Sequence, residues 1–290
     1  MIPLEDFFYD IVSKAQRGLK LGNGDVADAA GVSLAEVEEL KRGKLNEPAL
    51  RKIAPVLKLS AARLIDLANN AWYPKVETPA DGFAAFNTPF EDMTVNSYLL
   101  WDPATKEGVA FDTGASCVDM LAKAKACGVT IRLILLTHSH GDHIFDLPAL
   151  LSATSDAPVW INEAEADAVP EAQTFASPQG SDSTRRSFNV GCLAIEARPT
   201  VGHSRGGTTY VVHGLEIPGS PGAAVAIVGD AVFAGSMGGG AVSYSDALRT
   251  NREYIYTLPD ETILCPGHGP LTTVGEEKRH NPFAVEFEEA

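Results

Sequence analysis

The stretch LTHSHGDHIF at residues 136–145 places three histidines and an aspartate within six positions. The chain has only seven histidines in its 290 residues, so nearly half of them lie on this one short segment. An apolar run at residues 131–136 leads into the segment and predicts a buried strand. A polar loop held by ordinary hydrogen bonds does not need this concentration of imidazoles. We therefore expect the loop to be part of a functional site.

The spacing within the loop points to metal ligands. In an extended backbone His138 and His140 project to the same side, because side chains alternate with a period of two. Gly141 permits a sharp turn that brings Asp142 and His143 toward the same space. Imidazole and carboxylate groups together suit zinc, iron or manganese. The loop predicts two imidazoles for one ion, with an aspartate and a third imidazole for a neighbouring ion.

Further ligands are expected at the ends of later strands. His203 lies in TVGHSRGGTTYVV, Asp230 ends the apolar run GAAVAIVGD, and His268 lies between glycines in LCPGHGP. Each is a polar side chain that follows an apolar strand, with a glycine nearby that allows close approach. His213 and His280 lack this setting, and we interpret them as surface or packing histidines.

The chain divides into segments of different character. Residues 1–72 hold 10 basic and 10 acidic residues and predict a helical domain, and residues 73–82 contain two prolines and a glycine and predict a linker. Residues 73–290 hold 13 basic and 28 acidic residues, which accounts for the whole net charge of −15 and repels nucleic acid and anionic membranes. Their strands alternate with helices, which predicts an α+β domain.

Helices are expected at residues 4–20, 23–31, 32–43, 46–59, 60–72 and 117–128, and strands at 96–102, 107–114, 131–136, 158–162, 188–199, 207–214, 222–230 and 261–267.

The N-terminal helices resemble the helix-turn-helix domain of the Cro/repressor family. A short helix closed by Gly31 precedes a helix that begins at Ser33, with Glu36 three residues later in the capping-box pattern. The second helix starts with glutamates, whose charge opposes a phosphate backbone, and its cations come only at its end. We expect this module to pack on the rest of the chain or to mediate homo-oligomerisation, and we expect no nucleic-acid partner.

The histidine pattern resembles that of the metallo-β-lactamase fold of hydrolases. HxHxDH at 138–143 is followed in order by the three later ligands, and FDTG at 111–114 matches the first motif of that superfamily. The resemblance covers residues 83–290 and implies an αββα sandwich with two divalent metal ions, zinc or alternatively iron or manganese. It implies a first metal held by His138, His140 and His203, a second held by Asp142, His143 and His268, and a bridging Asp230. Asp112 is implied to orient the ligand loop without binding a metal.

Two segments resemble the short glyoxalase II-like hydrolases, which are of the hydroxyacylglutathione hydrolase type. They are PGHGPLTTVGEEKRHNPF at 266–283 and GDAVFAGSMGGG at 229–240. The resemblance implies hydrolysis of a small thioester such as S-lactoylglutathione, with hydroxide generated at the metals as the nucleophile. Asp142 is the residue expected to be catalytic, by orienting this nucleophile. The cations expected to bind substrate are Arg205, Lys278 and Arg279.

Two alternative functions stay open at this point. A mononuclear iron persulfide dioxygenase would use His138, His203 and Asp230, but that family normally keeps an arginine where this chain has Gly239 and Gly240. The other alternative is a sensor whose metal site reports to a DNA-binding N-terminal domain. Oxygen consumption with glutathione persulfide distinguishes the first alternative, and salt-dependent DNA binding distinguishes the second.

The location of the protein is inferred from what the sequence lacks. The N-terminus has no cationic run before an apolar core, so we expect no signal peptide. No apolar stretch approaches the ~18 residues that a membrane span needs. The four cysteines show no CxxC spacing and are expected to be reduced thiols. We therefore expect a cytoplasmic protein that acts on a small molecule.

Overall fold

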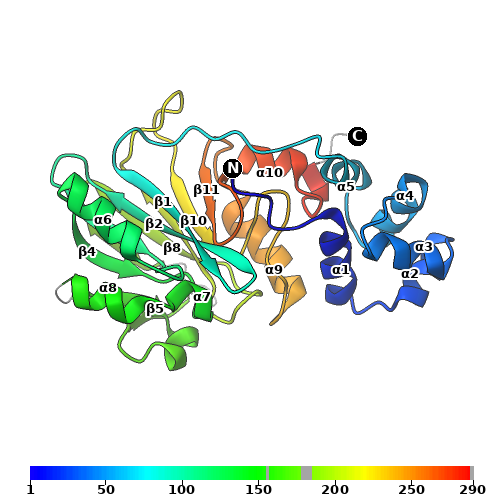
Figure 1. The fold of residues 1–290 in the computed structure, drawn as a ribbon, viewed down its shortest axis with the longest axis horizontal. Helices are drawn as coiled ribbons and strands as arrows, with labels where there is room; N and C mark the ends of the chain where they lie inside the picture. The colour runs from blue at the N-terminus through cyan, green and yellow to red at the C-terminus, as the bar shows by residue number, and fades with distance from the viewer. Residues whose placement is uncertain (155–156, 178–184, 288–290) are drawn as a thin grey trace.

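The computed structural model describes residues 1–154, 157–177 and 185–287. Two six-stranded sheets face each other, and helices cover their outer faces (Figure 1). Five N-terminal helices, drawn in blue, form a separate group at one end of the molecule. Within the described residues, no helix is long and apolar enough to cross a membrane.

The first sheet brings the histidine loop to one of its edges. Its strands β3, β4 and β5 run parallel, so their carboxyl ends meet at one edge of the sheet. Asp112 directly follows β3, and the histidine loop directly follows β4. The strands, in spatial order, are β1 (Phe83–Phe90), β2 (Met93–Trp101), β3 (Glu107–Phe111), β4 (Thr130–Leu135), β5 (Val159–Asn162) and β6 (Gln173–Phe175).

The second sheet supplies the remaining predicted ligands. Its strands β10 and β11 are parallel, so Asp230 after β10 and His268 after β11 emerge at the same edge. His203 lies in the connection between β8 and β9, and β9 begins beside the end of β10. The strands, in spatial order, are β12 (Thr272–Thr273), β11 (Ile263–Pro266), β10 (Val225–Gly229), β9 (Thr208–His213), β8 (Leu193–Pro199) and β7 (Ser187–Val190).

Three apolar layers hold the sandwich together. Between the sheets, Phe111 and Leu135 of the first sheet pack with Tyr210 and Ile227 of the second. On the outer face of the first sheet lie α6 (Val118–Cys127) and α8 (Leu147–Ala153), and the short α7 (Gly141–Ile144) lies within the histidine loop. On the outer face of the second lie η2 (Asn251–Ile255) and α10 (Val274–His280). The expected αββα layering is therefore present. The remaining short elements are η1 (Glu163–Ala168), α9 (Tyr244–Thr250) and η3 (Val285–Phe287).

The N-terminal module consists of the five expected helices. They are α1 (Phe8–Gly18), α2 (Asn23–Ala30), α3 (Leu34–Lys41), α4 (Glu47–Val56) and α5 (Ala61–Ala68). Gly31 ends α2 in the left-handed conformation, with φ 61°. The capping box is formed, since Ser33 Oγ accepts from Glu36 N and the Glu36 carboxylate accepts from Ser33 N at 2.8 Å. These local features are confirmed, whereas the likeness to a DNA-binding domain stays a prediction.

The module shares its apolar core with the rest of the chain. Met237, Ala247 and Phe283 belong to the same buried cluster as the inner faces of α1 to α5. The buried guanidinium of Arg63 donates to the carbonyls of Asn281 at 2.9 Å and of Lys278 at 2.8 Å, near the end of α10. The segment that joins α5 to β1 crosses the molecule beside α10 (Figure 1). The module is therefore packed against the sandwich, close to α9 and α10.

Some sequence predictions of strands were wrong. The single strand expected at 188–199 is two strands, β7 and β8, joined by a turn at Gly191. Gly191 has φ 53°, and a Cβ there would overlap Asp102, so the apolar run is broken by a position that only glycine fits. Strands β1, β6 and β12 were not expected, and α1 begins at Phe8 instead of at residue 4. The missed strands are half-exposed or very short, so they lack a clear apolar pattern.

The contact between α1 and α9 generates a stability prediction. In an exposed helix alanine is favoured over glycine by about 1 kcal/mol. A Cβ at Gly18 would overlap the ring of Tyr244, however, so we expect Gly18→Ala to lower the free energy of unfolding by about 1–3 kcal/mol in urea denaturation. The control is Gly24→Ala in α2, where a Cβ has nothing within 4 Å and should leave stability equal or higher. A Gly18→Ala protein as stable as the wild type would contradict this packing.

Candidate metal centre

The seven predicted ligands lie together where the strand ends of the two sheets meet. Their donor atoms form two groups, and within each group they lie within 4.8 Å of one another. The first donor group is His138, His140, His203 and Asp230, and the second donor group is Asp142, His143 and His268. The division matches the one implied by the resemblance. Metal binding by these side chains stays a prediction. The chemistry of the donors shows whether the site fits metal ions.

Asp230 links the two donor groups. Its Oδ2 lies 3.3 Å from Nε2 of His203 and 3.5 Å from Nε2 of His268. Its Oδ1 lies 3.3 Å from Nε2 of His143. A Cβ at Gly267 would overlap this Oδ1, so the strand end that carries His268 approaches the carboxylate only because residue 267 is glycine. One carboxylate therefore faces donors of both groups.

Several polar atoms in the centre lack ordinary hydrogen-bond partners. The buried atoms His143 Nε2 and Asp230 Oδ1 have no well-aligned hydrogen bond to any described residue. His140 Nδ1 faces both His138 Nε2 at 3.0 Å and His203 Nε2 at 2.9 Å, and one ring nitrogen cannot satisfy both neighbours with a single proton. Buried polar atoms without partners are costly, and divalent cations with nitrogen and oxygen ligands would satisfy them. The donor set fits two metal ions.

Asp230 and His138 have charge states that suit cations. At His143 and His268 the neighbouring carboxylates outweigh burial and raise the pKa to about 10 and about 11, so both rings would release a proton on binding a metal. Burial by itself raises the pKa of Asp230, but His143 and His268 outweigh it and hold that pKa well below its usual value. Burial and the neighbouring His143 lower the pKa of His138 well below that of an ordinary histidine. The centre therefore contains an ionised carboxylate and a neutral imidazole, which are the forms that bind metals.

Backbone carbonyls fix the orientation of two imidazoles. His268 Nδ1 lies 2.7 Å from the carbonyl oxygen of Thr94, and His203 Nδ1 lies 3.0 Å from that of Gly239. Because a carbonyl oxygen only accepts, each Nδ1 carries the proton and donates it. Nε2 of each ring then faces the donor groups, where it would present its lone pair to a metal ion after releasing any proton that it carries.

Asp112 makes the contacts that its implied role requires. It is 2% exposed, and its carboxylate accepts from Thr137 N at 2.7 Å and from Thr137 Oγ1 at 2.8 Å. Its Oδ2 also lies 2.8 Å from Nδ1 of His143. Asp112 has φ 54°, a left-handed conformation that is strained for a residue with a Cβ. It therefore fixes both the start of the histidine loop and the ring of one predicted ligand.

Sequence reasoning missed Glu165, which lies in η1 after β5. Its side chain is 7% exposed, and its carboxylate accepts from Ser139 N at 3.3 Å, from the Ser139 hydroxyl, and from Gly206 N at 2.6 Å. Ser139 lies between two ligands of the histidine loop, and Gly206 lies three residues after His203. Glu165 thus joins the two loops that supply the three histidines of the first donor group. In the sequence it lies in an acidic run that resembles a solvated surface.

Asn96 was also missed and holds the loop of His268. Its Nδ2 donates to the carbonyls of Pro266 at 2.9 Å and Gly269 at 2.8 Å. Its backbone N donates to the carbonyl of Gly267 at 2.7 Å. These contacts cannot be predicted from a single asparagine in an apolar strand, because its partners belong to the opposite sheet.

The three cations expected to bind substrate have different surroundings. Lys278 pairs with Asp260 at 2.7 Å, and Arg279 pairs with Glu276 at 2.8 Å. Both lie in the last turn of α10, where positive charge complements the helix dipole. Arg205 is exposed and close in sequence to His203, and it forms no ion pair with any residue in the described part of the chain. Only Arg205 therefore remains as a free candidate for binding a substrate anion.

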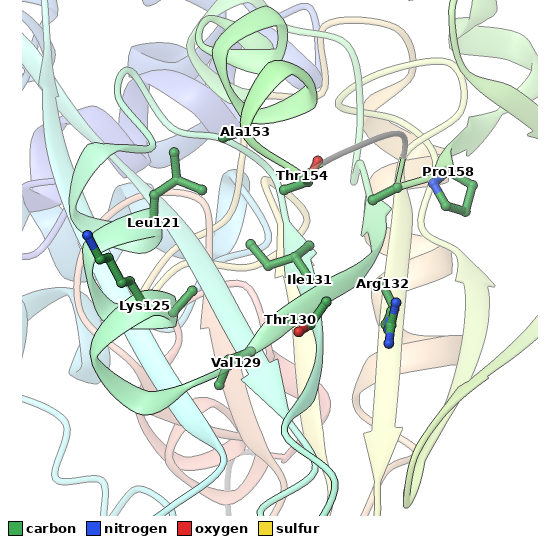
Figure 2. Close-up of a pocket in the computed structure, with 11 residues that line it drawn as sticks. Leu121, Lys125, Val129, Thr130, Ile131, Arg132, Ala153, Thr154 and Pro158 are labelled. Carbon is green, nitrogen blue, oxygen red and sulfur yellow. The ribbon is translucent and has the colours of Figure 1, made fainter.

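A cavity of about 460 Å³ lies away from the donor groups (Figure 2). It is bounded by α6, the beginning of β4 and the end of α8, with Leu121, Ile131 and Thr154 among its lining residues. The histidine loop follows the opposite end of β4. The cavity is lined by none of the predicted ligands, and it plays no part in the centre.

Comparison with protein families identifies the class of this protein. The model of the metallo-beta-lactamase superfamily matches residues 91–268, which include both donor groups. The chain therefore belongs to the metallo-beta-lactamase superfamily.

Two relatives are hydrolases by name. The chain is 29% identical over 204 residues to a probable metallo-hydrolase of Streptococcus pyogenes serotype M6, a match that covers 64% of this chain and 83% of the relative. It is 27% identical over 216 residues to the hydroxyacylglutathione hydrolase GloC of Haemophilus influenzae, covering 67% of this chain and 95% of the relative.

Solved structures of related proteins share the fold. The B3 metallo-beta-lactamase BLEG-1 is 29% identical with a TM-score of 0.54, and the match covers 70% of this chain and 100% of that one. ETHE1 from Myxococcus xanthus is 25% identical with a TM-score of 0.53, covering 70% and 85%. The similarity thus extends across superfamily members with different names, and the activity has to be argued from the site.

The contacts of Glu165 generate a prediction about metal retention. Glu165→Ala leaves the amides of Ser139 and Gly206 without their acceptor, so the loops of the first donor group lose their connection. We expect zinc affinity to fall about 10- to 100-fold, measured by the rate and extent of zinc transfer to a chromogenic chelator. Glu163→Ala changes an exposed carboxylate on the same helix and should retain zinc like the wild type. Equal retention by folded Glu165→Ala and Glu163→Ala would refute the role of Glu165.

Proposed function

We propose that this protein is a binuclear metal-dependent hydrolase that cleaves small thioesters. The observation that carries the proposal is the Asp230 carboxylate, which faces nitrogen donors of both groups. Membership of the superfamily and the likeness to a hydroxyacylglutathione hydrolase support it. In this proposal the catalytic domain is residues 83–290, joined by residues 73–82 to the helix-turn-helix-like domain at residues 1–72.

The donor groups would hold two divalent ions, with zinc as our first choice and iron or manganese as alternatives. When bound, such ions lower the pKa of a water molecule toward ~7 and polarise a carbonyl oxygen. The first ion would be held by the first donor group and the second by the second donor group, with Asp230 shared between them. Asp112 and Glu165 would keep the ligand loops in place for both ions.

Asp142 is the proposed catalytic residue of this chain. Burial raises the pKa of its carboxyl, but the hydrogen bond with His268 and the charge of His143 together bring that pKa below its usual value. Its Oδ2 lies 3.2 Å from Nε2 of His268. An ionised carboxylate in this position can accept a proton from the attacking water and orient that water toward a carbonyl carbon. A thiolate leaves without a strong general acid, because a thiol has a pKa of only about 8.5.

An exposed apolar surface adjoins the second donor group. Phe145 is 63% exposed and packs edge-on against Phe90, with ring centroids 5.5 Å apart. Phe145 lies two residues after His143. Phe90 and the exposed Met93 flank the turn between β1 and β2, and the next residue, Thr94, contacts His268 through its carbonyl. An apolar patch beside a polar centre suits an uncharged part of a substrate. This surface favours substrates with an apolar acyl or thiol part, so we propose such thioesters as substrates in addition to S-lactoylglutathione.

We propose that the helical module acts with the catalytic domain, or in homo-oligomers, without reading DNA. The charges of residues 1–72 balance, and residues 73–290 carry the whole net charge of −15. Such a protein has little electrostatic attraction for a polyanion. Sequence-selective binding of duplex DNA at physiological salt would instead favour the sensor alternative.

The proposed reaction is tested with a panel of thioesters. The zinc-loaded protein should hydrolyse S-lactoylglutathione or small thioesters with apolar acyl groups, measured by release of free thiol. Asp142→Ala should lower kcat about 10²- to 10⁴-fold, because it removes both a ligand of the second donor group and the group that orients the attacking water. The matched control is Asp167→Ala, which removes an exposed carboxylate outside the donor groups and should retain wild-type activity.

The outcome of the panel can overturn the proposal. A wild-type protein that carries two metals and leaves every thioester intact would exclude thioester hydrolysis. Oxygen uptake with glutathione persulfide by the iron-loaded protein would favour the dioxygenase alternative.

A further inference from the structure

The segment that follows Asp230 contacts an imidazole in each donor group. This segment, residues 231–240, is called the 231–240 loop. The carbonyl of Gly239 accepts from Nδ1 of His203 at 3.0 Å. The ring of Phe233 packs edge-on against the ring of His268, with centroids 5.6 Å apart. The position of the loop therefore sets the orientation of one ring in each group.

The loop cannot hold this position by its own backbone preferences. It contains four glycines, Gly235, Gly238, Gly239 and Gly240, and glycine loses more conformational freedom on ordering than any other residue. Most of the loop is nevertheless buried. Contacts from other parts of the chain have to fix its conformation.

One set of contacts comes from α10 and the residue after it. The buried carboxylate of Glu277 accepts from Gly235 N at 3.0 Å. Asn281 Nδ2 donates to the carbonyl of Ser236 at 2.7 Å. These two hydrogen bonds hold the middle of the loop from the side of the catalytic domain.

The other set comes from the N-terminal module. The carboxylate of Asp6 accepts from Ser236 Oγ at 2.6 Å and forms an ion pair with Lys14 of α1. Lys14 Nζ also donates to the carbonyl of Met237 at 2.9 Å and lies 5.1 Å from the ring centroid of Phe233. The side chains of Lys14 and Asp6 are only 15% and 8% exposed, so water does little to weaken these contacts.

The residues that the N-terminal module contributes to this arrangement lie outside the part of the chain that matches the superfamily. The match begins at residue 91, and neither Asp6 nor Lys14 falls within it. The alignment with GloC uses 67% of this chain but 95% of GloC, so a large part of this chain has no counterpart there. The N-terminal module is an addition, yet it reaches the loop behind the metal centre.

We propose that Asp6 and Lys14 are positioning residues for the metal centre. By holding Ser236 and Met237, they fix the 231–240 loop so that His203 and His268 present Nε2 to the two metal ions. The helical module then helps to position the ligands of the metal centre. This inference rests on the metal-binding part of the proposed function and is independent of the substrate.

The test measures zinc binding by the full-length protein in competition with a chromogenic chelator. Lys14→Met keeps the length of the side chain but removes its charge and its donors to Asp6 and Met237. We expect its zinc affinity to fall about 10-fold, the low end of the effect of removing a residue that orients metal ligands. Lys14→Arg, which restores charge and donors, should return the affinity to within about threefold of the wild type. Asp6→Asn should weaken zinc binding in the same direction.

The matched control is Arg17→Met, which removes an exposed cation from the same helix without touching the loop. It should bind zinc like the wild type, and urea unfolding of the metal-free variants separates loss of fold from loss of metal. If Lys14→Met does not fold, Asp6→Asn decides the question. Wild-type zinc affinity in folded Lys14→Met or Asp6→Asn, or an equal loss in Arg17→Met, would overturn this inference while leaving the hydrolase proposal intact. A wild-type protein that binds no zinc would overturn both.

Discussion

The structure depends on one buried carboxylate, that of Asp230, held between imidazoles from different loops. A buried ionised group is tolerated only where opposite charges or ligands compensate for lost hydration. Here His143, His203 and His268 approach its two oxygens from both donor groups. The position of Asp230 at the end of β10 therefore requires the ends of β4 and β11, and the connection from β8 to β9, to converge on the same point.

The sandwich meets this requirement through parallel strands in each sheet. The apolar layer between the sheets fixes their separation, and short polar contacts then adjust each ligand. Asp112, Glu165 and Asn96 each accept or donate two or more hydrogen bonds that join a ligand loop to another element. The helical module adds contacts to the loop behind Asp230, so the centre is supported from both ends of the chain.

The sequence predicted the parts of the molecule that depend on local pattern. The histidine loop, the later ligands at strand ends and the capping box at Ser33 can be recognised because each is a short motif with a fixed chemical meaning. The hairpin of β7 and β8 was missed, because its turn rests on a left-handed Gly191 within an apolar run. Glu165 and Lys14 were missed for a different reason. Glu165 contacts Ser139, which is 26 residues away, and Lys14 contacts Met237, which is 223 residues away, and no local pattern marks a charge that becomes buried only when the fold forms.

The central claim is that two metal ions share the carboxylate of Asp230, and anomalous diffraction from crystals of the zinc-loaded protein tests it most directly. The account predicts two zinc peaks per chain, ~3.5–4 Å apart, one beside each donor group with Asp230 between them. A single peak, or zinc bound away from these residues in crystals grown with excess zinc, would contradict it.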